Sequence, residues 1–172
     1  ALCLGVVLGM PASPAVAAGP PPKAEEELVE KVRKSIDAGV RYLKKQQNPQ
    51  GNWEGIVIGF LADMEGGSTA LVTLALLNSG VKKDDPSVAR AIEYLRKLPP
   101  KKTYVVALCN LVFAEIRDPK DLPLVQKNAD WLIGSALGWK ADANGRVTGK
   151  LEGWSYPQNQ IADNSNTQYA ML

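Results

Sequence analysis

The sequence of 172 residues predicts an all-α fold in which helical hairpins stack in two layers. Six segments repeat apolar residues at helical spacing. Amphipathic segments alternate along the chain with segments that are apolar on nearly every face. A helix that is apolar all round has to be covered all round, so the amphipathic helices are expected to cover the apolar ones. No segment alternates convincingly as a strand.

The amphipathic helices are expected over about residues 25–47, 86–98 and 122–137. In the first, charged residues separate apolar positions at helical spacing, from Leu28 to Leu43. Asp85 is expected to cap the second helix, with Pro86 at its first position, where a missing N–H has no consequence. Asp121 is expected to cap the third.

The apolar helices are expected over about residues 68–78 and 103–116, and a last helix from about 164 to 172. Ser68 suits the N-cap of the first, and Gly80 follows its end. Two long, glycine-rich connections, residues 48–67 and 138–163, carry tryptophans. Long loops of this kind are often functional.

Local patterns predict that the chain is a set of three divergent helical hairpins. The amphipathic helices share the order apolar, charged, aromatic, leucine in Val40-Arg41-Tyr42-Leu43, Ile92-Glu93-Tyr94-Leu95 and Ala129-Asp130-Trp131-Leu132. The apolar helices and the last helix share a threonine near their start, with a leucine five residues later, in the pairs Thr69 and Leu74, Thr103 and Leu108, and Thr167 and Leu172.

The first residues have the composition of an export signal. Residues 1–18 carry no charge and join an apolar run to Ala15-Val16-Ala17, as in a secretory signal peptide whose basic start is missing. The run is too short to span a bilayer. Residues 19–24 are expected to form a proline-rich linker, and residues 25–172 the repeat domain, truncated at its C-terminus. The protein is therefore expected outside the cytoplasm, periplasmic or extracellular, without membrane association once the signal is removed.

The charged residues and the cysteine restrict the classes of function. The net charge is +2 and basic residues are mixed with acidic ones, so no nucleic-acid partner is expected. Beyond the signal the only cysteine is Cys109, which lies in an apolar stretch. It is expected to be a buried small apolar residue rather than a nucleophile.

The first hairpin resembles a known repeat. Gln47, Gly51 and Trp53 match the Gln-x-x-x-Gly-x-Trp core of the QW repeat found in the squalene cyclase and prenyltransferase-like superfamily. Trp131-Leu132, then Gly153-Trp154-Ser155-Tyr156-Pro157 and Asp163-Asn164-Ser165-Asn166-Thr167, are similar to a degenerate copy. The resemblance covers residues 36–172. It implies an α/α toroid, of which this chain would form about half, and a structural role for Gln47, Gly51 and Trp53.

The catalytic groups of that superfamily are missing from the sequence. The cyclases use an Asp-x-Asp-Asp acid motif, and the only neighbouring aspartates here are Asp84-Asp85, expected to cap a helix. The chain has no histidine, which excludes a zinc site of the prenyltransferase type. No catalytic residue, metal or cofactor is therefore assigned. The candidate binding residues are aromatic or acidic side chains of the long connections, namely Trp53, Asp63, Glu65, Trp154, Tyr156 and Asp163.

Three functions remain at this stage. The first is an exported, non-catalytic binding or scaffold domain with an apolar, isoprenoid-type ligand or a protein partner. The alternative is part of a terpene cyclase-like enzyme whose acidic motif lies beyond residue 172. A thioester-containing helical toroid ranks last, because the Cys-Gly-Glu-Gln sequence that forms the thioester is absent.

Overall fold

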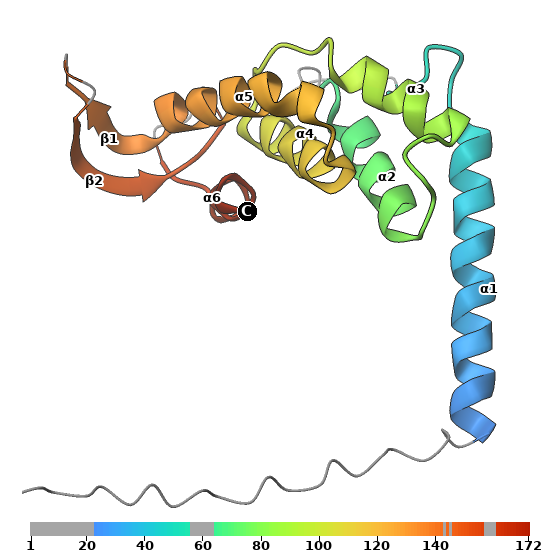
Figure 1. The fold of residues 1–172 in the computed structure, drawn as a ribbon. Helices are drawn as coiled ribbons and strands as arrows, with labels where there is room; N and C mark the ends of the chain where they lie inside the picture. Colours follow the sequence, from blue (N-terminus) through green and yellow to red (C-terminus); the bar gives the residue numbers. More distant parts are fainter. Residues whose placement is uncertain (1–22, 56–63, 143, 145, 157–160) are drawn as a thin grey trace, which may run out of the picture. The chain divides into compact units, whose positions relative to one another are not determined.

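The computed structural model describes residues 23–55, 64–142, 144, 146–156 and 161–172 (Figure 1). The predicted signal peptide, residues 1–18, and the first four residues of the predicted linker lie outside this set. The chain divides into two units, residues 1–35 and 36–172. Each unit is described by itself below.

The described residues are mainly helical, as expected. The helices are α1 (Lys23–Gln46), α2 (Gly67–Asn78), α3 (Pro86–Leu95), α4 (Thr103–Ile116), α5 (Leu122–Ser135) and α6 (Asn164–Met171). A 3-10 turn, Pro119–Asp121, precedes α5. Two strands, β1 (Leu137–Ala141) and β2 (Val147–Gly153), lie between α5 and α6. The predicted helices are all present, but the third and fifth end three and two residues earlier than expected.

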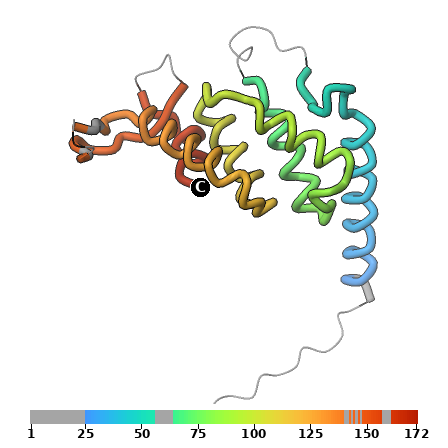
Figure 2. Tube along the Cα trace, turned by 45° about the horizontal axis from the view of Figure 1, so that its top comes forward, coloured from blue at the N-terminus to red at the C-terminus, as the bar shows by residue number. Residues whose placement is uncertain are grey.

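Within the unit of residues 36–172, the helices form two rows (Figures 1 and 2). Helix α4 contacts α2 on one side and α6 on the other, which makes these three helices one row. Helix α3 packs on α2, and α5 packs on α4. Two of the three amphipathic helices, α3 and α5, thus each cover part of an apolar helix.

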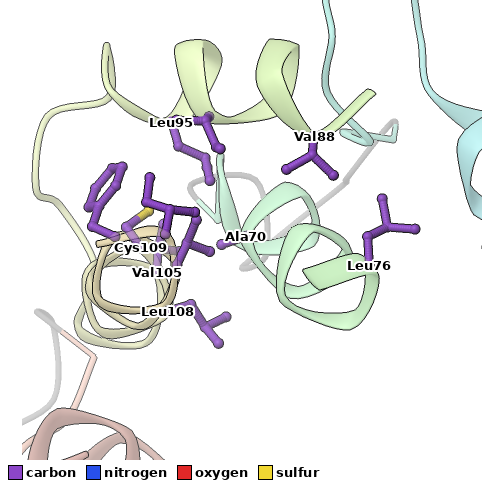
Figure 3. Close-up of a cluster of buried hydrophobic side chains, with 11 residues drawn as sticks. Ala70, Leu76, Val88, Leu95, Val105, Leu108 and Cys109 are labelled. Atoms are coloured by element: carbon purple, nitrogen blue, oxygen red, sulfur yellow. The ribbon is translucent and has the colours of Figure 1, made fainter. Parts of the chain in front are cut away.

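The core lies between α2, α3 and α4. Figure 3 shows Val88 and Leu95 on the face of α3 that is turned toward α2 and α4. Leu76 of α2 and Leu108 of α4 are almost fully buried in the same cluster. Each such side chain contributes about 1.5–3 kcal/mol through removal of apolar surface from water.

The two apolar helices are not covered equally. Helix α4 is buried on most of its faces. Helix α2 buries only the side that carries Thr69, Thr73 and Leu76, and its Leu71 is 51% exposed. The expectation that α2 is covered all round is therefore wrong among the described residues.

The helix starts confirm one predicted cap and correct two others. The carboxylate of Asp85 accepts a hydrogen bond from the backbone N–H of Ser87 at 3.0 Å, and Pro86 is the first residue of α3. Ser68 does not cap α2, because the helix already begins at Gly67. Asp121 occupies the N-cap position of α5 but accepts no hydrogen bond from that helix. Its carboxylate instead accepts two from the guanidinium of Arg96, at 2.7 and 2.8 Å.

The strands correct the prediction that the chain contains none. They pair antiparallel, with Trp139 opposite Gly149 and a register shift between Leu137 and Trp139. The sequence Val147-Thr148-Gly149-Lys150-Leu151-Glu152 alternates apolar or small residues with polar ones, which is a strand signal. The glycines at 145, 149 and 153 obscured it.

The unit of residues 1–35 is described only from residue 23, the first residue of α1. Its Leu28, Val29 and Val32 are each at least half exposed. Glu30 forms surface ion pairs with Arg33 and Lys34. None of the helices in the described part of the chain has the length and apolar character needed to cross a membrane.

Candidate functional site

Trp53 closes the end of α1. Its indole Nε1 donates a hydrogen bond to the carbonyl oxygen of Leu43 at 2.7 Å, and its backbone N–H donates to Thr69 Oγ1 at 3.0 Å. The Leu43 carbonyl lies in the last turn of α1. The backbone N–H of Gln47, which would bond to this carbonyl in a continuing helix, donates to the carbonyl of Lys44. Carbonyls of a last helical turn lack intrahelical donors. The indole supplies one and ties the end of α1 to the start of α2.

Trp154 makes the equivalent two hydrogen bonds in the third hairpin. Its Nε1 donates to the carbonyl of Leu132 at 2.7 Å, and its backbone N–H donates to Thr167 Oγ1 at 2.9 Å. Leu132 stands three residues before the end of α5, as Leu43 does in α1. The backbone N–H of Ala136 bonds to Ile133 and leaves the Leu132 carbonyl to the indole and to the hydroxyl of Ser135. The first and third hairpins thus share one bonding scheme.

The middle hairpin needs no tryptophan. Leu95 is the sequence equivalent of Leu43 and Leu132, and its carbonyl accepts a hydrogen bond from the backbone N–H of Leu98. The short turn therefore closes its own helix end. Thr103, the equivalent of the two bridging threonines, donates to the carbonyl of Ser155 at 3.0 Å. It joins the middle hairpin to the connection that follows β2.

Gln47 and Gly51 join the first hairpin to α3. The amide Nε2 of Gln47 donates to the carbonyl of Gly51 at 2.9 Å and to that of Ser87 at 2.8 Å. Gly51 has a φ of 82°, and a Cβ there would lie 2.8 Å from Cβ of Arg90. Only glycine allows both this conformation and this approach. The three residues of the QW match thus make contacts that hold helices together.

The acidic candidates do not gather into a site. Asp63 lies outside the described residues. Glu65 accepts a hydrogen bond from the hydroxyl of Tyr94 at 3.3 Å. Asp163 caps α6 by accepting from the backbone N–H of Asn166 at 2.8 Å. The hydroxyl of Ser165 and the N–H groups of Asn166 together hold the pKa of Asp163 below its ordinary value.

The aromatic candidates also separate. Trp53 and Trp154 serve different hairpins, and Trp154 borders a hollow in the structure. Tyr156 is half-buried. Its charge, when ionised, contributes to raising the pKa of Tyr104, for which the hydrogen bond with Tyr169 is the largest cause. The rings of Tyr104 and Tyr169 meet edge to face with centroids 4.4 Å apart.

A hollow of about 360 Å³ lies among α4, α5, α6 and β1. This volume falls in the range of small-molecule sites. Its lining is mostly apolar or aromatic and consists of Ala107, Asn110, Leu111, Ala114, Val125, Ala129, Leu132, Ile133, Trp139, Trp154, Tyr169, Ala170 and Leu172. None of these residues is an acid, a lysine or an arginine.

The hollow lies where the contact between α4 and α5 differs in sequence from the equivalent contact between α2 and α3. Ala129 of α5 occupies the position that Ile92 occupies in α3, three residues before the shared leucine. Asn110 of α4 lies seven residues after Thr103, as Leu76 lies seven residues after Thr69. Ile92 and Leu76 are 4% and 0% exposed and fill the contact between α2 and α3. The smaller Ala129 and the polar Asn110 leave the equivalent space between α4 and α5 open.

A polar pair borders this space. Asn128 is 5% exposed, and its Nδ2 donates to Oδ1 of Asn110 at 2.9 Å. The corresponding position in α3 is Ala91, which is fully buried. The Nδ2 of Asn110 lies 3.4 Å from the carbonyl of Val125, a long hydrogen bond. An apolar packing contact has thus been replaced by an amide pair next to an apolar hollow.

The sequence predictions missed the lining of this hollow except Trp154. The signal was available, because alignment of the hairpins places an alanine and an asparagine where the preceding contact has isoleucine and leucine. Its meaning required the structure, since a smaller residue leaves a space only if its neighbours do not fill that space.

The described residues offer no sign of metal or thiol chemistry. They contain no group of three or more acidic or cysteine side chains that could hold a metal ion. Cys109 is buried, and burial raises the pKa of its thiol to about 12. The predicted burial of Cys109 is thus confirmed, and burial disfavours the thiolate, which is the reactive form.

In comparisons with known proteins, no family model, no curated protein and no solved structure matches this chain.

Proposed function

We propose that this chain is a non-catalytic binding domain that holds an apolar ligand, such as an isoprenoid chain, in the hollow between α4 and α5. The observation that carries the proposal is the paired change at Ala129 and Asn110. The equivalent positions in the preceding hairpin contact carry the larger, buried side chains of Ile92 and Leu76. Protein interiors are close-packed with few voids larger than a water molecule, so a mostly apolar hollow of this size supports a ligand site.

The lining of the hollow supports binding rather than catalysis. Acid–base catalysis needs a group that gains or loses a proton near neutral pH within reach of the substrate. The lining contains no acidic or basic side chain. The acids that the sequence singled out, Glu65 and Asp163, are occupied in hydrogen bonds outside it.

The two rows of helices and the bridges support a wider proposal about the fold. Gln47, Gly51 and Trp53 join helices in the manner that the resemblance to QW repeats implies. We therefore propose that the described hairpins form about half of an α/α toroid. The predicted signal in residues 1–18 adds the proposal that the domain acts outside the cytoplasm, in the periplasm or beyond the cell.

Lipid retention with product analysis tests the binding proposal. The chain is incubated with squalene or with farnesol, separated from free lipid by gel filtration and extracted, and the lipid is analysed. We expect unchanged lipid to remain with the protein. Cyclised product would instead support the cyclase alternative, and absence of both retention and product would leave a protein-binding scaffold.

A matched pair of variants ties retention to the hollow. Ala129→Ile restores the residue of the preceding hairpin and fills the space, so we expect affinity to fall by about 10-fold or more through lost apolar contact. Ala75→Ile adds the same atoms at an exposed position of α2. It should bind like the parent chain. Equal retention by both variants would place the ligand elsewhere and contradict the proposal.

A further inference from the structure

The first half of α1 carries an apolar stripe that stays open to solvent. The stripe consists of Leu28, Val29 and Val32, which recur at helical spacing and are 61%, 51% and 50% exposed. The amphipathic helices α3 and α5 instead pack on apolar helices of the chain. Most of the stability of an amphipathic helix comes from packing of its apolar face, so this stripe is expected to have a partner.

Charges are segregated along the same turns of α1. Residues 25–30 contain four glutamates and no basic residue. Residues 31–34 contain Lys31, Arg33 and Lys34 and no acidic residue. Two copies of this helix packed in parallel would set acid beside acid and base beside base. An antiparallel pair sets the acidic turns of one copy beside the basic turns of the other, which is the complementary arrangement.

Glu26 and Arg33 flank the apolar stripe. They are separated by about two helical turns, so both lie on the Val29 side of the stripe. Charged residues that flank an apolar stripe form ion pairs between neighbouring helices and set their orientation. Glu26 forms no ion pair within the described residues, and Arg33 pairs at 3.5 Å with the exposed Glu30. Exposed pairs of this kind contribute little, so Arg33 is free to exchange its partner.

We propose that the apolar stripe of α1 is a self-association surface, on which a second copy of this chain packs its own stripe in the antiparallel direction. Val29 of each copy then meets Val32 of the other. Glu26 of each copy pairs with Arg33 of the other. The interface is isologous, so each contact occurs twice. Because the stripe is short, the dimer is weak and its population depends on protein concentration. The proposal does not depend on the ligand hollow.

Sedimentation velocity on the whole chain, at concentrations up to about 1 mM, measures the association. We expect a monomer–dimer equilibrium. Val32→Glu places an unpaired charge in the stripe and should weaken the dimer at least about 10-fold. Leu122→Glu is the matched control, because Leu122 is an exposed leucine of α5, and this variant should associate like the parent chain. Far-ultraviolet circular dichroism checks that each variant keeps its helices.

A charge exchange tests both the partner and the direction of packing. Glu26→Arg and Arg33→Glu each set like charges opposite one another, so each variant alone should dimerise at least about 10-fold more weakly. An equimolar mixture of the two should recover most of the parent affinity, because every pair again joins an acid to a base. A parent chain that is monomeric throughout, a Val32→Glu dimer as tight as the parent dimer, or a mixture no tighter than its components would overturn the proposal and leave the stripe to a different protein.

Discussion

The replacement Gly51→Ala provides a direct test of how the first hairpin is joined to α3. Two effects oppose an alanine at this position. The φ of 82° is left-handed, which is unfavourable by about 1 kcal/mol for a residue with a Cβ. The new Cβ would also lie 2.8 Å from Cβ of Arg90 and 3.2 Å from its carbonyl oxygen. Backbone cannot move aside freely, so overpacking adds about 1–3 kcal/mol.

The matched control is Gly80→Ala. Gly80 has nearly the same φ, 85°, but a Cβ there would meet nothing within 4 Å. It therefore shows the conformational effect alone, about 1 kcal/mol. We expect Gly51→Ala to lower the free energy of unfolding by about 2–4 kcal/mol and Gly80→Ala by about 1 kcal/mol. The difference between them measures the close approach of the loop to α3.

Urea unfolding followed by far-ultraviolet circular dichroism measures both values. Tryptophan fluorescence is a poorer probe, because Trp53 lies next to the substituted position. If the two variants lose the same stability, the approach of Gly51 to α3 contributes nothing, and the argument that glycine is required there by contact is refuted.

Three further outcomes are expected. Trp154→Phe should lower the free energy of unfolding by about 1–3 kcal/mol in a urea titration, because the carbonyl of Leu132 loses its indole donor; an unchanged midpoint would contradict this. The ion pair with Lys44 lowers the pKa of Asp85. Asp85→Asn keeps the helix cap but removes this ion pair. A lowered pKa stabilises the fold above the unfolded value near 3.9 and stops doing so as the pH falls through the folded value. The variant should therefore lose about 0.5–1 kcal/mol at pH 7 and nothing at the lowest pH where the chain stays folded. Cys109 should react with a thiol reagent only after denaturant is added, since its thiol is buried and its pKa is about 12; rapid labelling of the native chain would be the contrary result.

Helical periodicity was sufficient to locate the helices, because apolar residues recur at helical spacing within them. Asp85 and Pro86 marked the start of α3 correctly, since this cap forms between neighbouring residues. Ser68 and Asp121 failed for different reasons. Gly66, with a positive φ, takes the N-cap position of α2, whereas the guanidinium of the distant Arg96 binds the carboxylate of Asp121.

The candidate site was predicted less well than the fold. Trp154 was singled out and borders the hollow, whereas Asn110, Ala129 and Trp139 were not. A site made by an absent side chain has no motif of its own. It becomes visible only when equivalent positions are compared, here Ala129 with Ile92, and when the structure shows that no neighbour has moved into the space.

The hydrogen bond between each bridging tryptophan and its threonine affects how far the loop lengths of this chain can vary. It fixes Trp53 to Thr69 and Trp154 to Thr167, so the segments between these residues are held at both ends. Loop closure entropy grows only slowly with length. We therefore expect the helix pairs to keep their registration when these two segments are lengthened or shortened. The segments are suited to carrying a grafted peptide or a second domain on an unchanged helical frame.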